Sequence, residues 1–462
     1  MTQELPQDLP DWAGLAATFG TRASRAESHL ARVRGDASPV PGQPQAWVSP
    51  RNREEVRELV LWARRHRVPL VARGAGTSLD GESVAWKGGV AVDFSGMDRV
   101  LEIRPADQIA RVEPGVVNAS LQAILGPLGL FFPPNPGSWM TSTVGGNVGT
   151  NASGFRSFRY GPTRRWVTGL EGVLGSGETF ETGTLSRKRS AGPDPIPLLV
   201  GSEGTLALFT EITVRLAPIP PRRFGVLVDL PGNVTPGTVA RAFQGRGDLG
   251  LSAVEWVDRS VARVLATETG WSLEGAHGAL LLEVEASPET EGPLWDALGR
   301  ELAGMGIPGP PRRIEDADHF WKARGRAGEL LDREMGPRIR EDVGVPLSQW
   351  DQLLERLDEV ARRHGIPWIA YAHLGEGNLH PNFRIDPASP EAVAVRGEVW
   401  AAARDLGGTV SAEHGMGALK GAHFEEEHGR TVAAMLRSLK RDCDPDGILN
   451  PGKLYGPVAG PP

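Results

Sequence analysis

The sequence contains a single cysteine, Cys443, among its 462 residues. One thiol cannot form an internal disulfide, and it cannot supply the thiolates of a cysteine-rich zinc site or of an iron–sulfur cluster. If the protein carries out redox chemistry, its electrons must therefore leave through a bound cofactor to an acceptor outside the chain. We expect Cys443 itself to be a packing residue.

Long apolar segments and blocks of like charge are also missing. No apolar run approaches the roughly 20 residues that span a bilayer, and no run of five like charges occurs. The net charge of -7 argues against nucleic acid as a partner. The first residues are acidic and lack the apolar core of a secretory signal. We therefore expect a cytoplasmic protein that could reach a membrane peripherally, through a partner.

The length favours two or three domains, because 462 residues exceed one ordinary core. Residues 1–45 are predicted to form a helical N-terminal extension. A β–α–β unit follows, with strands at 46–48 and 70–72 and a helix between them whose apolar residues recur at helical spacing. From 129 to 154 the chain is rich in Gly, Pro, Asn, Ser and Thr, which predicts a functional loop without regular structure.

A stiff, proline-rich junction at 218–221 marks the predicted boundary to a second domain. Beyond it, 225–230 and 279–285 have the pattern of strands, and 254–267 and 288–304 have the pattern of helices. This order favours an α+β domain built on a helix-backed antiparallel sheet. The tail at 444–453 is predicted to be a loop.

Three loops of small residues lie in the first predicted domain, at 73–81, 145–154 and 201–205. The first is not a Rossmann fingerprint, because Leu79 stands where the third glycine would fall. Glycines let backbone N–H groups approach an anion closely. Together the loops suggest backbone wrapped around a long, phosphate-bearing ligand, with turn-rich packing as the alternative.

Near the C-terminus, His373 and His380 flank a turn that contains Gly375 and Gly377. A turn can direct both imidazoles at one point. Glu413 and His414 follow and add a carboxylate and a third imidazole. This set of groups suits a divalent metal with an adjacent acid or base.

Seven segments, taken in order, resemble the FAD-dependent 2-hydroxy-acid dehydrogenase family from about Ala46 to Lys453. This family includes flavin-type D-lactate dehydrogenases, the flavin subunit of glycolate oxidase and D-2-hydroxyglutarate dehydrogenase. Each segment is weakly specific alone, and their joint order is highly specific. The segments are 71–78, 133–137, 145–154, 201–205, 373–380, 411–417 and 450–453.

The resemblance implies an α+β protein with a two-lobed FAD-binding domain of the vanillyl-alcohol-oxidase or PCMH type. It places this domain at 46–218, an inserted α+β cap domain on an antiparallel sheet at 219–417, and a C-terminal return at 418–462. Non-covalent FAD is expected, because Ala75 occupies the centre of the first loop and Cys443 is remote in sequence. The residues implied in FAD binding are Arg73, Gly74, Ala75, Gly76, Thr77, Ser78, Pro136, Gly137, Thr143, Gly145, Gly146, Gly149, Asn151, Ala152, Gly154, Gly204 and Asn450.

The resemblance also implies roles in the second domain. His373, His380 and Glu413 would ligate a divalent metal, usually zinc, and His414 would take the hydroxyl proton as hydride passes to flavin N5. Arg324 matches an arginine whose guanidinium binds the substrate carboxylate through two hydrogen bonds, as a fork. Arg340 matches a basic position that faces the substrate. Glu376 replaces the aspartate more usual between the two glycines.

The expected function is oxidation of a D-2-hydroxy acid, with D-lactate or glycolate favoured. D-2-hydroxyglutarate oxidation is one alternative. Another is the flavin subunit of a multi-subunit glycolate oxidase, and a non-catalytic binding protein is a third. The external electron acceptor would be a quinone, a cytochrome, an electron-transfer flavoprotein or an iron–sulfur subunit. The chain could also form a homodimer.

Overall fold

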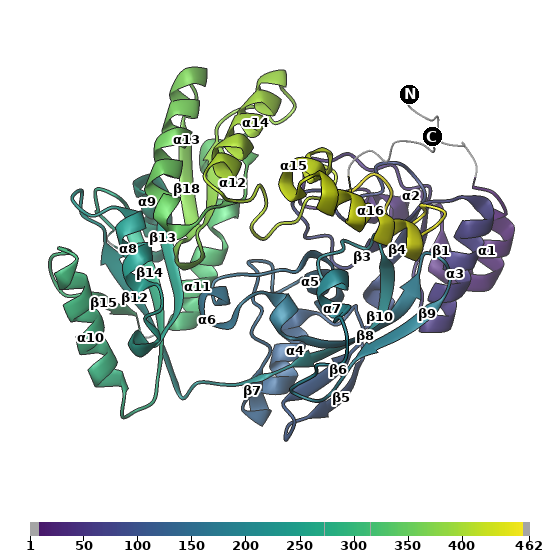
Figure 1. Cartoon of the computed structure of the whole chain (residues 1–462), viewed down its shortest axis with the longest axis horizontal. Coiled ribbons are helices and arrows are strands. Elements are labelled where there is room, and N and C mark those ends of the chain that lie inside the picture. Colours follow the sequence, from purple (N-terminus) through teal and green to yellow (C-terminus); the bar gives the residue numbers. More distant parts are fainter. Residues whose placement is uncertain (1–8, 272, 315, 456–462) are drawn as a thin grey trace. The chain divides into compact units, whose positions relative to one another are not determined.

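The computed structural model describes residues 9–271, 273–314 and 316–455 (Figure 1). The chain divides into two compact units. Unit 1 contains the residues up to Ser153, Pro162–Pro218, and the residues from His414 onward. Unit 2 contains Gly154–Gly161 and Ile219–Glu413. The chain therefore passes from one unit to the other four times.

Unit 1 begins with a four-stranded sheet in the order β1-β2-β4-β3, formed by Ala23–Ser24, Ala46–Val48, Val90–Asp93 and Leu70–Arg73. Strands β2 and β3 both run parallel to β4. Helix α3 (Arg53–His66) connects them and begins at Asn52, whose side chain accepts a hydrogen bond from the Glu55 N–H. The apolar face of α3 is buried against this sheet. Helices α1 (Trp12–Phe19) and α2 (Glu27–Val33) precede it.

A second, antiparallel sheet in unit 1 has the order β5-β6-β10-β8-β9. Its strands are Val100–Arg104, Ile109–Val112, Ala207–Arg215, Val167–Leu174 and Thr179–Gly183. The short strands β7 (Leu130–Phe131) and β11 (Ala217–Pro218) pair separately. Helices α4 (Asn118–Leu125), α5 (Val144–Thr150) and α7 (Ile196–Leu199) complete this part.

Helix α5 differs from the prediction of an irregular loop at 129–154. Its sequence contains three glycines, which have poor helix propensity. Thr143 caps its start by accepting a hydrogen bond from Gly146 N, and Asn151 ends it in the left-handed conformation. Val144 and Val148 are fully buried. Capping and burial therefore outweigh the low intrinsic propensity.

The C-terminal segment completes unit 1. It contains α15 (Phe424–His428) and α16 (Arg430–Cys443), drawn in yellow in Figure 1. After α16, Leu449 pairs as a parallel bridge with Leu70 at the start of β3, and both are fully buried. The segment after α16 thus extends the first sheet and shares its core.

Unit 2 is built on an eight-stranded sheet whose path is β15-β12-β14-β13-β18-β19-β16, with β17 also pairing β19. All of these pairings are antiparallel. The strands are Arg312–Ile314, Arg222–Asp229, Ala279–Ala286, Leu251–Val257, Trp368–His373, Asn378–Phe383, Ile339–Arg340 and Val343–Gly344. Strands β13 and β14 are buried along their whole length.

Three helices share one core with this sheet: α9 (Arg259–Thr269), α11 (Ala317–Gly325) and α12 (Ala327–Met335). The other helices of at least eight residues are α8 (Pro236–Phe243), α10 (Glu291–Gly304), α13 (Trp350–His364) and α14 (Pro390–Asp405). The prediction of one helix at 254–267 is wrong, because 254–257 belongs to β13 and α9 begins only after Asp258. Within the described residues, every helix is too short or too polar to cross a bilayer.

The segment Gly154–Gly161 joins unit 2 although it follows the second glycine-rich loop in sequence. Its short helix α6 (Ser157–Tyr160) is anchored by polar contacts to β14. Arg156 Nε donates to Glu283 Oε1 at 2.7 Å, and the Tyr160 hydroxyl donates to Glu285 Oε2 at 2.6 Å. Phe155 stacks on Trp321 with 5.0 Å between ring centroids.

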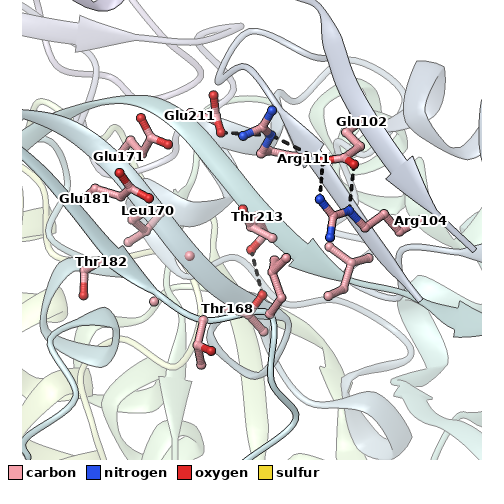
Figure 2. A pocket seen from close by; sticks show the side chains of 15 residues that line it. Glu102, Arg104, Arg111, Thr168, Leu170, Glu171, Glu181, Thr182, Glu211 and Thr213 are labelled. Atoms are coloured by element: carbon pink, nitrogen blue, oxygen red, sulfur yellow. Dashed lines mark hydrogen bonds and ion pairs between the residues drawn. The ribbon is translucent and has the colours of Figure 1, made fainter. Parts of the chain in front are cut away.

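A polar pocket lies on the five-stranded sheet of unit 1 (Figure 2). Its charged side chains pair with one another: Arg104 Nε lies 2.7 Å from Glu102 Oε1, and Arg111 Nε lies 3.1 Å from Glu211 Oε1. Thr168 Oγ1 is directed at the Thr213 carbonyl oxygen, 3.5 Å away. The pocket's acidic and basic groups thus largely satisfy each other.

Candidate functional site

His373 and His380 lie on a β-hairpin of unit 2. His373 ends β18, a tight turn follows at Leu374–Glu376, and Gly377 takes the left-handed conformation (φ 78°) before β19 begins. His380 is paired with Tyr371, two residues before His373. Because side chains alternate along a strand, both histidines face the same side of the hairpin. Their rings lie edge to face with centroids 5.2 Å apart.

Glu413 brings its carboxylate to both imidazoles. Its Oε1 atom lies 3.2 Å from His373 Nε2 and 3.1 Å from His380 Nε2. Both histidines are buried, at 5% and 3% exposure. The structure thus brings together the three residues expected to ligate a metal.

Asp342 adds a second carboxylate that the sequence analysis missed. Its Oδ2 atom accepts hydrogen bonds from Glu413 N at 3.0 Å and from Ser411 Oγ at 3.2 Å. One ligand atom each from Asp342, His380 and Glu413 fall within 4.8 Å of one another. His414 is the next residue after Glu413 and the first of the last segment of unit 1.

Glu255 and Arg324 lie behind His373. Glu255 Oε1 lies 2.6 Å from His373 Nδ1, and Glu255 Oε2 accepts from Arg324 Nη2 at 2.7 Å. Burial alone would lower the pKa of His373, but the carboxylates of Glu255 and Glu413 raise this pKa well above its ordinary value. The same carboxylates that favour a proton on the buried His373 ring would also favour a metal cation bound there in place of that proton.

The donor set therefore fits a divalent metal. Two imidazole nitrogens and a carboxylate oxygen are the ligands that zinc takes in catalytic sites, and the other ring nitrogen of such a histidine usually faces a carboxylate. His373 has this arrangement, with Nε2 toward Glu413 and Nδ1 toward Glu255.

The two predicted arginines occupy different surroundings. Arg324 lies on α11 and is 3% exposed, with its guanidinium engaged by Glu255. Arg340 lies on β16, and its side chain is 39% exposed and pairs with Asp332 at 2.5 Å. Glu376 lies in the short helical turn between the two histidines.

In unit 1, the three glycine-rich loops and Asn450 meet. The Thr143 hydroxyl lies 2.4 Å from the position that a Cβ on Gly74 would take, so a larger residue there would have to displace the Thr143 side chain. Glu203 N donates to the Gly149 carbonyl at 2.8 Å. Asn450 Nδ2 donates to the carbonyls of Glu203 and Glu82. The remaining predicted FAD-binding residues belong to the same loops or, for Pro136 and Gly137, to the turn before α5.

These loops, together with Ser142 and Asn450, carry buried polar atoms that have no hydrogen-bond partner within the described part of the chain. Buried polar groups in native proteins are nearly always satisfied, so such a concentration points to a polar ligand. Gly137 and Gly149 also border open space. The atoms are Arg73 Nη1, Ser142 Oγ, Asn147 Nδ2, Ser202 Oγ and Asn450 Oδ1. They fit a long ligand rich in acceptors and donors, such as FAD.

Two family models match this chain. The model described as "FAD binding domain" matches residues 44–183, and the model described as "FAD linked oxidases, C-terminal domain" matches residues 234–454. The matched ranges cover the three glycine-rich loops only in part, since residues 201–205 fall between them. The second range contains His373, His380 and Glu413.

Three curated relatives align along most of the chain. Glycolate oxidase subunit GlcD of Bacillus subtilis is 32% identical, covering 91% of each chain. D-2-hydroxyglutarate dehydrogenase of Stutzerimonas stutzeri is 32% identical, covering 89% of this chain and 91% of the relative. D-lactate dehydrogenase of Archaeoglobus fulgidus is 31% identical, covering 88% and 90%.

Among solved structures, p-cresol methylhydroxylase with bound substrate superimposes with a TM-score of 0.80 at 16% identity, covering 96% of this chain and 95% of the other. This likeness confirms the predicted α+β, PCMH-type fold. Together with the relatives' identity and coverage, it identifies the chain as a member of the FAD-linked 2-hydroxy-acid dehydrogenase family.

Proposed function

We propose that this chain oxidises a D-2-hydroxy acid, with D-lactate or glycolate favoured, to the 2-oxo acid. The substrate hydroxyl loses a proton and the α-carbon loses a hydride, so the site needs a base and a hydride acceptor. Non-covalent FAD, when bound, supplies the hydride acceptor. The electrons then require an acceptor outside the chain, because the only cysteine is Cys443.

The convergence of His373 and His380 on Glu413 carries this proposal. These three residues would hold a divalent ion, with zinc favoured. Such an ion lowers the pKa of a bound hydroxyl and orients the substrate. The burial of both histidines keeps bulk water from their ring nitrogens.

Two further residues have proposed roles toward the substrate. A ring nitrogen of His414 would accept the hydroxyl proton, since an imidazole is basic enough to do so near neutral pH. Arg340 would bind the substrate carboxylate. Its guanidinium is partly exposed and could exchange the Asp332 carboxylate for that of a ligand.

The test is an anaerobic titration of the purified, flavin-loaded protein with D- and L-forms of lactate and 2-hydroxyglutarate and with glycolate. We expect the flavin absorbance to bleach with a D-acid or glycolate and a chelator to abolish bleaching. Acid precipitation should leave a colourless pellet, because the FAD is not covalently attached. If none of the acids bleaches the flavin, the proposed oxidation of a 2-hydroxy acid is wrong. If bleaching persists after thorough metal removal, the proposed need for a metal is wrong.

A matched pair of histidine variants sharpens this test. His380→Ala should lose metal and the metal-dependent bleaching. His364→Ala should keep both, although His364 on α13 also faces two carboxylates, Glu391 and Glu398.

A second candidate function is the flavin subunit of a larger oxidase, since one relative of 32% identity is named as a subunit. The two candidate functions predict different activities for the purified chain alone. The proposed dehydrogenase should reduce an artificial dye as a purified chain, whereas an obligate subunit should be inactive until its partner is added.

A further inference from the structure

Glu255 is a fully buried carboxylate beside the candidate metal ligands. It lies in the middle of β13, is 0% exposed, and has one contact on each oxygen. Oε1 is 2.6 Å from His373 Nδ1, and Oε2 is 2.7 Å from Arg324 Nη2. In this arrangement both oxygens are directed at protein groups.

The contact at Nδ1 determines which nitrogen of His373 can bind a metal. A carboxylate accepts hydrogen bonds, so Glu255 favours the tautomer with the proton on Nδ1. The lone pair is then on Nε2, the atom that faces Glu413 at 3.2 Å. The carboxylate also makes the imidazole a more basic ligand and fixes the ring's orientation.

Arg324 in turn holds Glu255. It is 3% exposed, and its guanidinium lies over the ring of Tyr371 at 4.6 Å and over that of Phe155 at 5.3 Å. These rings fix the plane of the guanidinium, and cation–π contacts favour its charge. A buried carboxylate without such a partner would be costly. The positive charge of Arg324 therefore offsets the cost of burying the negative charge of Glu255.

We propose that Glu255 is a positioning residue for His373 and that Arg324 supports it. On this proposal, Arg324 acts on the metal site through Glu255 and His373, rather than only as a fork for the substrate carboxylate. The proposal rests on the proposed function, because it assumes that His373 is a metal ligand.

The test measures the zinc affinity of metal-stripped, flavin-loaded protein by competition with a chromogenic chelator. Glu255→Gln keeps the shape of the side chain but removes its charge. We expect zinc affinity to fall about 10–100-fold, as it does when carboxylates behind ligating histidines are removed. Glu255→Asp keeps the charge but moves it away from Nδ1, so it should give a smaller loss in the same direction.

Glu283→Gln is the matched control. Glu283 lies on the neighbouring strand β14, is equally buried, and is also paired with an arginine, Arg156. Within the described part of the chain, its side chain contacts Arg156, Arg223 and Ser252 rather than the candidate metal ligands. This substitution should lower stability and leave zinc affinity within about twofold of the unsubstituted protein.

Arg324→Met separates the two roles of the arginine. Support of Glu255 predicts weaker zinc binding and a lower kcat at saturating zinc. A role confined to binding the substrate carboxylate predicts unchanged zinc affinity and a raised KM, and this result would overturn the part of the proposal that concerns Arg324.

The outcomes are distinguishable. Unchanged zinc affinity in folded Glu255→Gln or Glu255→Asp, in a protein that binds zinc and oxidises a hydroxy acid, would overturn the inference and leave the proposed function intact. If the unsubstituted protein binds no zinc, the metal part of the proposed function fails, and the inference fails with it.

Discussion

Glu283 shows how this protein tolerates a buried charge in a sheet. Burial alone would raise the pKa of the Glu283 carboxyl, but Arg156 outweighs burial through its charge and hydrogen bonds, with further contributions from Arg223 and Ser252. The pKa is therefore held below its ordinary value of 4.5. Because Arg156 belongs to the short segment Gly154–Gly161, this pair also fixes that segment to β14.

Glu283→Gln should destabilise the protein at neutral pH, by on the order of 3 kcal/mol, since it removes the buried carboxylate that pairs with Arg156. A carboxyl with a depressed pKa stabilises the fold above its unfolded pKa, and this contribution is lost as the pH falls through the folded pKa. The difference in melting temperature between the two proteins should therefore shrink below about pH 4.5. A difference that stays constant down to pH 3 would contradict the depressed pKa.

The candidate metal ligands could be proposed at the level of single residues because they are confined to short motifs, and the structure brings these residues together. His373 and His380 flank one turn, and Glu413 adjoins His414. Glu255 and Asp342 could not be found in this way, since they are distant in sequence and reach the site only through the sheet. A signal for Glu255 was present, because a lone carboxylate in the apolar run Leu251–Val257 requires a buried partner.

At the scale of elements, Asp258 joins α9 to the central sheet of unit 2. Its Oδ1 caps α9 by accepting from Ser260 N and Val261 N, both at 2.8 Å. Its Oδ2 accepts from Ala370 N on β18 at 2.5 Å. One side chain thus begins a helix and holds the strand that ends in His373.

Asp258→Ala should cost more than an ordinary helix cap, whose loss is worth about 1 kcal/mol, because the Ala370 N–H also loses its partner. Ser389→Ala, which removes the cap of α14 and an exposed hydrogen bond to the Asp386 carbonyl, is the control. Asp258→Asn should recover the cap but not the contact to Ala370. Thermal unfolding of the three variants measures these differences, and equal losses for Asp258→Ala and Ser389→Ala would contradict the second contact.

Element prediction succeeded where periodicity was unambiguous and failed where burial was complete. Helix α3 has one apolar face and was predicted from its spacing. Strand β13 is buried on both faces, so its mainly apolar sequence does not alternate and cannot be told from a buried helix. Residues 254–257 were therefore assigned to the helix that follows. Helix α5 was missed because its glycines have low propensity, and only Thr143 marks its start.

At the scale of the whole chain, the C-terminal segment of unit 1 holds the third glycine-rich loop through hydrogen bonds. Lys440 is buried on α16 and donates from Nζ to the carbonyls of Thr205 at 2.7 Å and Leu449 at 2.8 Å. It also pairs with the buried Asp444, whose carboxylate accepts from Leu449 N. Thr205 ends the third glycine-rich loop, so this lysine links that loop to the tail.

Lys440→Met should therefore lower both the melting temperature and the amount of flavin retained on purification. The variant leaves Asp444 as a buried, unpaired charge, and such a loss costs about 3–5 kcal/mol. Lys188→Met replaces an exposed lysine of unit 1 and should change neither quantity. Full flavin content in folded Lys440→Met would contradict the link between the tail and the loop.

The overall fold could be predicted from the order of motifs, because that order resembles a known family, and relatives aligned over about nine-tenths of the chain confirm the family. The crossing of Gly154–Gly161 into unit 2 was not accessible. It depends on Phe155, Arg156 and Tyr160 finding partners more than a hundred residues later.

The four crossings of the chain between units also govern the order in which the protein can form during synthesis. Unit 2 has its last residue at Glu413, whereas unit 1 still awaits the segment that begins at His414 and supplies Lys440, Leu449 and Asn450. A nascent chain can therefore complete its histidine hairpin before it completes the loops that fit FAD. The chain could thus bind FAD and carry out redox chemistry only after nearly all of it has left the ribosome.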